Sequence, residues 1–196
     1  MSWSRLTSVL EKYDGALIPI AEDAIHPAYV DPLPTEPRLD IVLERRPDAY
    51  ARFVAANGYS IVSTRGRNTS FAFLPPKLAA RVTRAMGEPG RSWEDVTEER
   101  AAGRSQFAWV MFAAYDLSDV NGWAFGPGPD ATPVVWSVED SVPCEMIGTF
   151  DEWLAIQADE LERQLMAVQK VLEQNESASD DDWTEVDDAV TAIEHF

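Results

Sequence analysis

The sequence predicts an α+β fold in which a mostly antiparallel sheet is flanked by helices and followed by a long C-terminal helix. Segments rich in aromatic and β-branched residues follow one another closely in the middle of the chain, which favours strands that pair with their sequence neighbours. Segments with apolar residues at steps of three and four, typical of amphipathic helices, lie on both sides of them. The 196 residues divide into a domain at residues 1–174 and a tail at residues 175–196, which combines an acidic linker with a short amphipathic helix.

Two amphipathic helices are predicted before the first strands. The first spans Ser2 to Tyr13, and Gly15 is expected to end it. Residues 26–38 contain four prolines and predict a rigid connector without regular structure. The second helix has Pro47 in its first turn and ends at Asn57-Gly58, because proline suits a first turn and glycine allows a left-handed exit.

The rest of the domain is predicted to consist of strands with short helices between them. Short helices are expected from Pro75 to Gly87 and from Ser92 to Gly103. A capping box formed by Thr149 and Glu152 opens the longest helix, whose apolar stripe continues to about residue 174. The predicted strands span residues 59–64, 69–74, 107–115, 123–125, 133–138 and 143–148.

The charge distribution limits the kinds of partner. The chain has 34 acidic and 16 basic side chains, which give a net charge of −18. Residues 105–196 contain twenty of the acids and two of the bases, so this part alone carries −18. Nucleic acids and anionic membranes need basic side chains at the contact, so we expect neither as a partner. A strong acidic field instead favours association with a basic protein.

Several features predict a soluble protein of the cytoplasm. The longest apolar run, residues 107–115, is far shorter than the roughly 20 residues that span a bilayer. The first residues contain no apolar segment typical of a signal peptide. The single cysteine, Cys144, excludes a disulfide within the chain, and its apolar surroundings predict a buried, inert thiol.

We expect no catalytic, metal or cofactor site. The two histidines, His26 and His195, lie in the proline-rich connector and at the penultimate position, away from any candidate nucleophile in the sequence. The chain lacks the nucleophile-elbow, phosphate-loop and zinc-protease motifs. Acidic pairs are numerous, and a solvated surface explains them better than general acid catalysis, which needs a buried carboxylate.

Seven tryptophans are a high content for a chain of this length. Trp109 and Trp153 lie in apolar segments and are expected in the core. Trp123 and Trp136 flank a glycine- and proline-rich turn, and aromatic rings beside acids suit a contact with a basic protein. The alternative is that both rings pack against the sheet. The acids near this turn are Asp130, Glu139 and Asp140.

Four motifs, in order, match the pattern of a known family. The first is Pro47-x-x-Tyr50-x-x-Phe53-Val54 closed by Asn57-Gly58, with Arg46 in place of the family's leucine. The others are Phe107–Ala114, Gly122–Phe125 with Pro133–Trp136, and Thr149–Leu154. Over residues 40–165 the chain therefore resembles the SUKH superfamily, which includes relatives of fungal cell-wall synthesis regulators and bacterial immunity proteins.

The resemblance implies a protein that acts by binding and has no catalytic residues. Bacterial members of the family are immunity proteins, which neutralise a cognate toxin domain in the cytoplasm by blocking its active site or locking it in an inactive conformation. We expect a basic toxin domain as the partner, because many toxins act on nucleic acid. Charge and aromatic content together predict the contact residues, which are Asp116, Asp119, Trp123, Asp130, Trp136, Glu139 and Asp140.

Two other function classes stay open. A secretion chaperone or adaptor would hold an apolar segment of an effector, and the amphipathic segment Trp183–Phe196 would be its client or dimer contact. An enzyme built on carboxylates has the least support, because no histidine or cysteine is placed to assist. The tail itself could pack on the domain, join two copies as a homodimer, or order only on binding.

Overall fold

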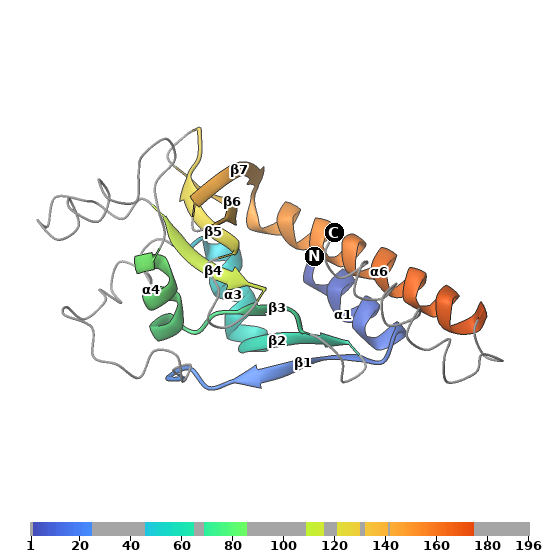
Figure 1. Ribbon diagram of the computed structural model, residues 1–196. Coiled ribbons are helices and arrows are strands. Elements are labelled where there is room, and N and C mark those ends of the chain that lie inside the picture. The colour runs from blue at the N-terminus through green and yellow to red at the C-terminus, as the bar shows by residue number, and fades with distance from the viewer. Residues whose placement is uncertain are drawn as a thin grey trace, which may run out of the picture.

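The computed structural model describes residues 2–24, 46–64, 69–85, 109–115, 121–129, 132–140 and 142–174 (Figure 1). Within these residues it contains four helices and one seven-stranded antiparallel sheet, so the predicted α+β class and the long C-terminal helix are confirmed. The helices are α1 (Ser2–Lys12), α3 (Asp48–Asn57), α4 (Pro76–Ala85) and α6 (Phe150–Gln174). The strands are β1 (Gly15–Ile20), β2 (Tyr59–Thr64), β3 (Thr69–Phe73), β4 (Val110–Ala114), β5 (Gly122–Pro127), β6 (Pro133–Glu139) and β7 (Val142–Gly148). Three predicted segments lie outside the described residues: the connector at 26–38, the helix from Ser92 to Gly103, and the tail at 175–196.

The strands cross the sheet in the order in which they occur in the chain. Each strand pairs with the next one, and every pair is antiparallel. The prediction that close strands pair as neighbours is therefore confirmed. This arrangement leaves β1 and β7 as the two edges of the sheet.

Strand β1 was not expected from the sequence. Helix α1 ends as predicted, but Asp14 takes the left-handed turn conformation with φ of 58°, and Gly15 begins a strand instead of only ending the helix. Gly15 pairs with Thr64 in β2. Pro19 within β1 has no N–H to donate, which is compatible with an edge position.

Helices cover both faces of the sheet. Helices α1, α3 and α6 pack on one face, and α4 packs on the other (Figure 1). The two faces differ in chemistry. Large aromatic rings dominate the first face, and smaller aliphatic side chains make up most of the second. The rings on the first face include Phe71, Phe73, Phe112, Trp123 and Phe125. The side chains on the second face include Met111, Ala114, Ala124 and Val138.

Trp153 of α6 is the centre of the aromatic core. Its side chain is fully buried, and the predicted core positions of Trp153 and Trp109 are both confirmed. The Trp153 ring lies 4.9 Å from the ring of Phe112 and 5.3 Å from that of Trp123, between centroids. Phe71, Phe73 and Phe150 also contact it. Edge-to-face contacts of this kind add to the hydrophobic stabilisation of the rings.

The start of α6 is fixed by the predicted capping box. The Glu152 carboxylate accepts hydrogen bonds from the backbone N–H and the hydroxyl of Thr149, both at 2.8 Å. The Glu152 backbone N–H donates in return to the Thr149 hydroxyl at 3.3 Å. These bonds lower the pKa of Glu152 and place Phe150 and Trp153 at the start of the helix, facing the sheet.

Ion pairs join α1 to α6. Lys12 Nζ lies 2.9 Å from a Glu162 carboxylate oxygen, and Arg5 binds both Glu162 and Asp159. Hydrogen bonds from Lys12 and Arg5 lower the pKa of Glu162. The first helix therefore neutralises part of the acidic surface of α6.

Cys144 is exposed, so the prediction of a buried thiol is wrong. It lies in the edge strand β7, where the register with β6 shifts twice along the pair. The burial was predicted from the apolar neighbours of Cys144, but a bulged strand at the edge of the sheet leaves such residues open to solvent. The neighbouring residues Glu145 and Met146 are exposed as well.

Replacement of Trp153 tests the importance of the aromatic core. We expect Trp153→Ala to lower the free energy of unfolding by about 3–5 kcal/mol, because it removes the ring around which the others pack. On the same helix, Ile156 is 51% exposed, and we expect Ile156→Ala to change the free energy by only about 0.5 kcal/mol. Urea unfolding followed by circular dichroism measures both. Equal losses in the two variants would contradict this description of the core.

Candidate functional site

The structure describes four of the seven residues predicted to contact a partner, namely Trp123, Trp136, Glu139 and Asp140. Three others, Asp116, Asp119 and Asp130, lie outside the described residues. The four described residues do not form one surface, because the sheet separates the two tryptophans. Trp136 is paired with Ala124, so it lies on the face opposite Trp123.

Trp123 is not the exposed anchor that the sequence suggested. Its side chain is 4% exposed and belongs to the aromatic core beneath α6. Trp136 is half-buried on the other face, where its ring lies 4.8 Å from that of Trp109 and nearly perpendicular to it. The Trp136 indole N–H donates to the Pro127 carbonyl oxygen at 3.3 Å. The alternative, in which the rings pack against the sheet, therefore holds for Trp123. It also holds for the buried part of the Trp136 ring.

Glu139 and Asp140 are exposed at one end of the sheet, where β4 ends, β5 begins and β6 turns into β7. Asn121 ties these strand ends together. Its carbonyl oxygen accepts a hydrogen bond from the Tyr115 N–H at 3.2 Å, and its side-chain oxygen accepts one from the Asp140 N–H at 2.6 Å. Asp140 has φ of 48°, a left-handed conformation that aspartate tolerates better than most residues. The backbone around the two acids is thus held in place.

Tyr115 is the aromatic residue that reaches the surface at this end. Its side chain is 53% exposed, and its ring lies 4.8 Å from the buried ring of Trp123. Partial burial is the main cause that raises the pKa of the Tyr115 phenol, and the negative charge of Glu139 is the second. The effect of this charge indicates that the Glu139 carboxylate lies near the ring. We name Tyr115, Glu139 and Asp140 the sheet-end surface.

Sequence reasoning missed Tyr115, because it assigned the residue to the end of a buried strand. The strand stops one residue earlier, at Ala114. A bulge between Met111 and Ala113 places one extra residue in β4 opposite β5. This extra residue moves Tyr115 to the same face as Trp123, and the sequence contains no clear signal of such a shift.

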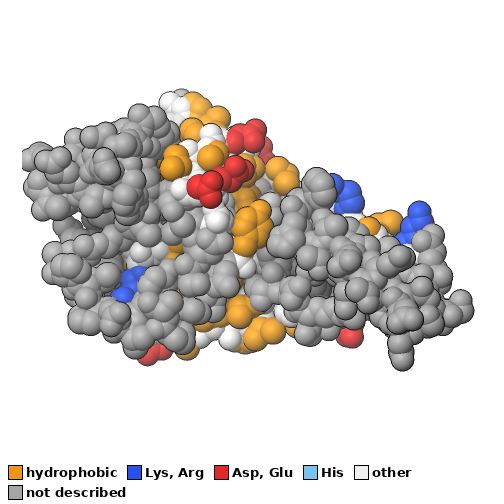
Figure 2. All heavy atoms as spheres, viewed as in Figure 1, with side chains coloured by type: hydrophobic (Ala, Val, Ile, Leu, Met, Phe, Trp, Pro, Cys, Tyr) orange, Lys and Arg blue, Asp and Glu red, His pale blue; other side chains and the backbone are white. Residues whose placement is uncertain are grey.

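The acids of the sheet-end surface are not neutralised within the part of the chain that the structure describes. The ion pairs shown between described residues lie on α1 and α6, and neither Glu139 nor Asp140 takes part in them. Figure 2 shows acidic side chains among hydrophobic ones over β6 and β7, with the visible Lys and Arg side chains elsewhere. Exposed Glu145 of β7 adds to the negative charge of this region.

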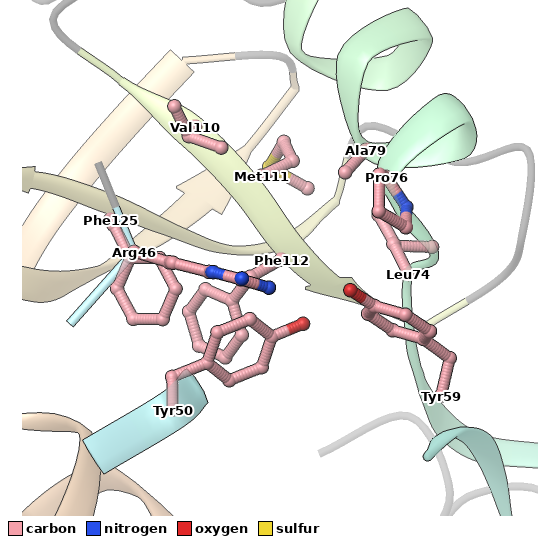
Figure 3. A pocket seen from close by; sticks show the side chains of 10 residues that line it. All are labelled: Arg46, Tyr50, Tyr59, Leu74, Pro76, Ala79, Val110, Met111, Phe112 and Phe125. Atoms are coloured by element: carbon pink, nitrogen blue, oxygen red, sulfur yellow. The ribbon is translucent and has the colours of Figure 1, made fainter. Parts of the chain in front are cut away.

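A second feature is a small hollow next to α3 and the start of β4, shown in Figure 3. The hollow is partly open to solvent, and its cavity volume is about 10 Å³, which is room for about one water molecule. The Arg46 guanidinium and the hydroxyls of Tyr50 and Tyr59 point toward the same space. Burial raises the pKa of Tyr50. Burial also raises the pKa of Tyr59, while the positive charge of Arg46 and its hydrogen bond to Tyr59 partly oppose this rise.

Among the described residues, no group of three His, Cys, Asp or Glu side chains is arranged to hold a metal ion. His26 and His195 lie outside the described residues. None of the described helices has both the length and the apolar character needed to cross a membrane.

Comparisons with protein-family models, with curated proteins and with solved structures found no match for this chain. The SUKH family therefore stays a prediction that depends on the four sequence motifs.

The proximity of Glu139 to Tyr115 can be tested by titration. We expect Glu139→Gln to lower the pKa of Tyr115, because the variant removes a negative charge that disfavours the tyrosinate. The pKa should stay above its ordinary value, since partial burial, the larger cause, is unchanged. Ultraviolet absorbance of tyrosinate, with Tyr115→Phe as the reference, measures the shift. Glu145→Gln is the control, and an equal shift in both variants would contradict the proximity.

Proposed function

We propose that this chain is a non-enzymatic inhibitor that binds and neutralises a basic protein, such as a bacterial toxin domain, in the cytoplasm. The observation that carries the proposal is the sheet-end surface, where an exposed tyrosine ring lies beside two carboxylates without a described ion pair. This function is the one that the resemblance to immunity proteins implies, and the net charge of −18 supports it.

The two kinds of side chain would contribute differently to binding. Tyrosine is enriched among the residues that dominate interface energies, because its ring buries a large area at a small cost in conformational entropy. Exposed carboxylates mainly speed the encounter with a partner of opposite charge. Tyr115 packs against a buried tryptophan, so the ring is supported from below before a partner arrives.

The described carboxylates favour binding over catalysis. A general acid needs a pKa raised by its surroundings. The two described carboxylates whose pKa values are shifted, Glu152 and Glu162, are both shifted downward by hydrogen bonds to the charged form. The exposed acids at the sheet end are better suited to attract cations than to transfer protons.

A paired set of variants tests the proposed surface. We expect Tyr115→Ala combined with Glu139→Gln and Asp140→Asn to weaken binding of the basic partner by about tenfold or more, through faster dissociation where the ring is lost and slower association where the charges are lost. The same variant should show a smaller dependence of the association rate on salt, since two interacting charges are removed. Surface plasmon resonance at several salt concentrations measures both effects. The partner used is the product of the gene next to that of this chain.

The control removes a similar set of side chains from the opposite edge of the sheet. Ile18→Ala with Glu22→Gln and Asp23→Asn also removes one exposed apolar side chain and two exposed acids. We expect this control to bind almost as tightly as the unchanged chain. Equal losses in the two variants would show that the sheet-end surface is not the contact.

Co-expression distinguishes the proposed inhibitor from a chaperone. An inhibitor should relieve the growth defect caused by the isolated toxic domain and should co-purify with that domain. Capture of only an apolar or N-terminal segment of the effector, without relief of toxicity, would support the chaperone function and contradict ours.

A further inference from the structure

We propose that the hollow lined by Arg46, Tyr50 and Tyr59 binds a carboxylate group. Three hydrogen-bond donors face one small space: the guanidinium of Arg46 and the hydroxyls of Tyr50 and Tyr59 (Figure 3). This inference does not depend on the proposed function, because it concerns a different part of the molecule and a ligand of opposite charge.

The donors come from two elements and from the residue that precedes α3. Tyr50 belongs to α3, and its ring is fixed in the core by edge-to-face contacts with Phe112 and Phe125, at 5.3 and 5.1 Å between centroids. Tyr59 is the first residue of β2 and is also buried. Gly58, which joins the two elements, has φ of 72°, a left-handed conformation that places both tyrosines close to each other. The donor positions are therefore set by the fold.

Arg46 lacks a carboxylate partner among the described residues. No ion pair with a described acid involves it, and its described hydrogen bond is to the Tyr59 phenol. The charge of Glu22 reaches Tyr59, yet Glu22 forms no described ion pair with the guanidinium. None of the ten residues that line the hollow is acidic. A half-buried guanidinium in these surroundings is suited to an external anion.

The geometry of the donors favours a carboxylate among anions. The cavity volume of about 10 Å³ accepts one oxygen atom, so the rest of the ligand would lie at the open mouth of the hollow. A planar group with two oxygens matches the fork of a guanidinium, and one oxygen can also accept from a phenol. The remaining lining is apolar, including Leu74, Ala79 and Val110, which suits the carbon atoms of the ligand.

Titration of the full-length chain with sodium acetate tests the site. We expect saturable chemical-shift changes at the Arg46 side-chain N–H and at the Tyr59 ring, with a midpoint on the order of 10 mM. Sodium chloride at the same ionic strength should give no saturable change. An equal response to chloride, or no saturation with acetate, would overturn the proposal and leave the hollow as a site for water.

Two variants and one control assign the response to the hollow. We expect Arg46→Gln to weaken acetate binding by about tenfold, since a hydrogen bond to a charged group is lost. Tyr59→Phe keeps the ring and should weaken binding by a smaller factor, so it is informative even if Arg46→Gln is unstable. Arg52→Gln removes an exposed arginine from α3, the helix that contains Tyr50, and should leave binding unchanged. Unchanged binding in both Arg46→Gln and Tyr59→Phe would overturn the proposal.

A second titration identifies the source of the carboxylate. Alanyl-alanine presents the carboxylate of a peptide chain end, and its C-terminal amide has the same shape without the charge. Tighter binding of the free dipeptide than of acetate assigns the site to the end of a polypeptide, and equal binding assigns it to small free carboxylates. Binding of the amide as tight as that of the free dipeptide would contradict recognition of a carboxylate. Because neither titration contains a basic protein, its failure would leave the proposed inhibitor function unaffected.

Discussion

The insertion of Trp153 into the aromatic face of the sheet is the interaction on which the remaining structure depends. The capping box at Thr149 and Glu152 fixes where α6 starts, and three residues later the indole is buried among rings from β3, β4 and β5. These strands are consecutive in the sheet, so one side chain holds the middle of the meander against one helix. A sheet built only from neighbours in sequence needs such a contact, because its hairpins alone are marginally stable.

The same contact leads outward to the surface. Trp153 packs on Trp123, and Trp123 packs on Tyr115, so a continuous series of rings connects the core to the exposed sheet end. The surface ring is therefore held by packing on Trp123, and the hydrogen bond from the Tyr115 backbone N–H to the Asn121 carbonyl oxygen fixes the backbone beside it. A rigid aromatic ring beside carboxylates loses little entropy on binding, which is the property that an efficient contact surface requires.

The sequence predicted most elements but only part of the candidate surface. Helices and strands with local signals, such as Pro47, Gly58 and the capping box, have close to their expected bounds, because these signals act within a few residues. Strand β1 was missed, since its stability comes from pairing with β2 more than forty residues later. Tyr115 and Cys144 were assigned the wrong burial because apolar neighbours suggested buried segments, whereas β4 stops at Ala114 and β7 is a bulged edge strand. The end of a strand and its place in the sheet depend on pairing that a single sequence does not contain.

Topology, more than composition, decides which charges can attract a partner. Acids are numerous on α6, yet α1 packs along this helix and brings Arg5 and Lys12 to Asp159 and Glu162. No described base is paired with the acids at the sheet end, so their field is not cancelled locally. Arg46 lies beside two phenols in the hollow and forms no ion pair with a described carboxylate. A chain with a net charge of −18 can thus present a cation-attracting surface and an anion-binding hollow at separate places.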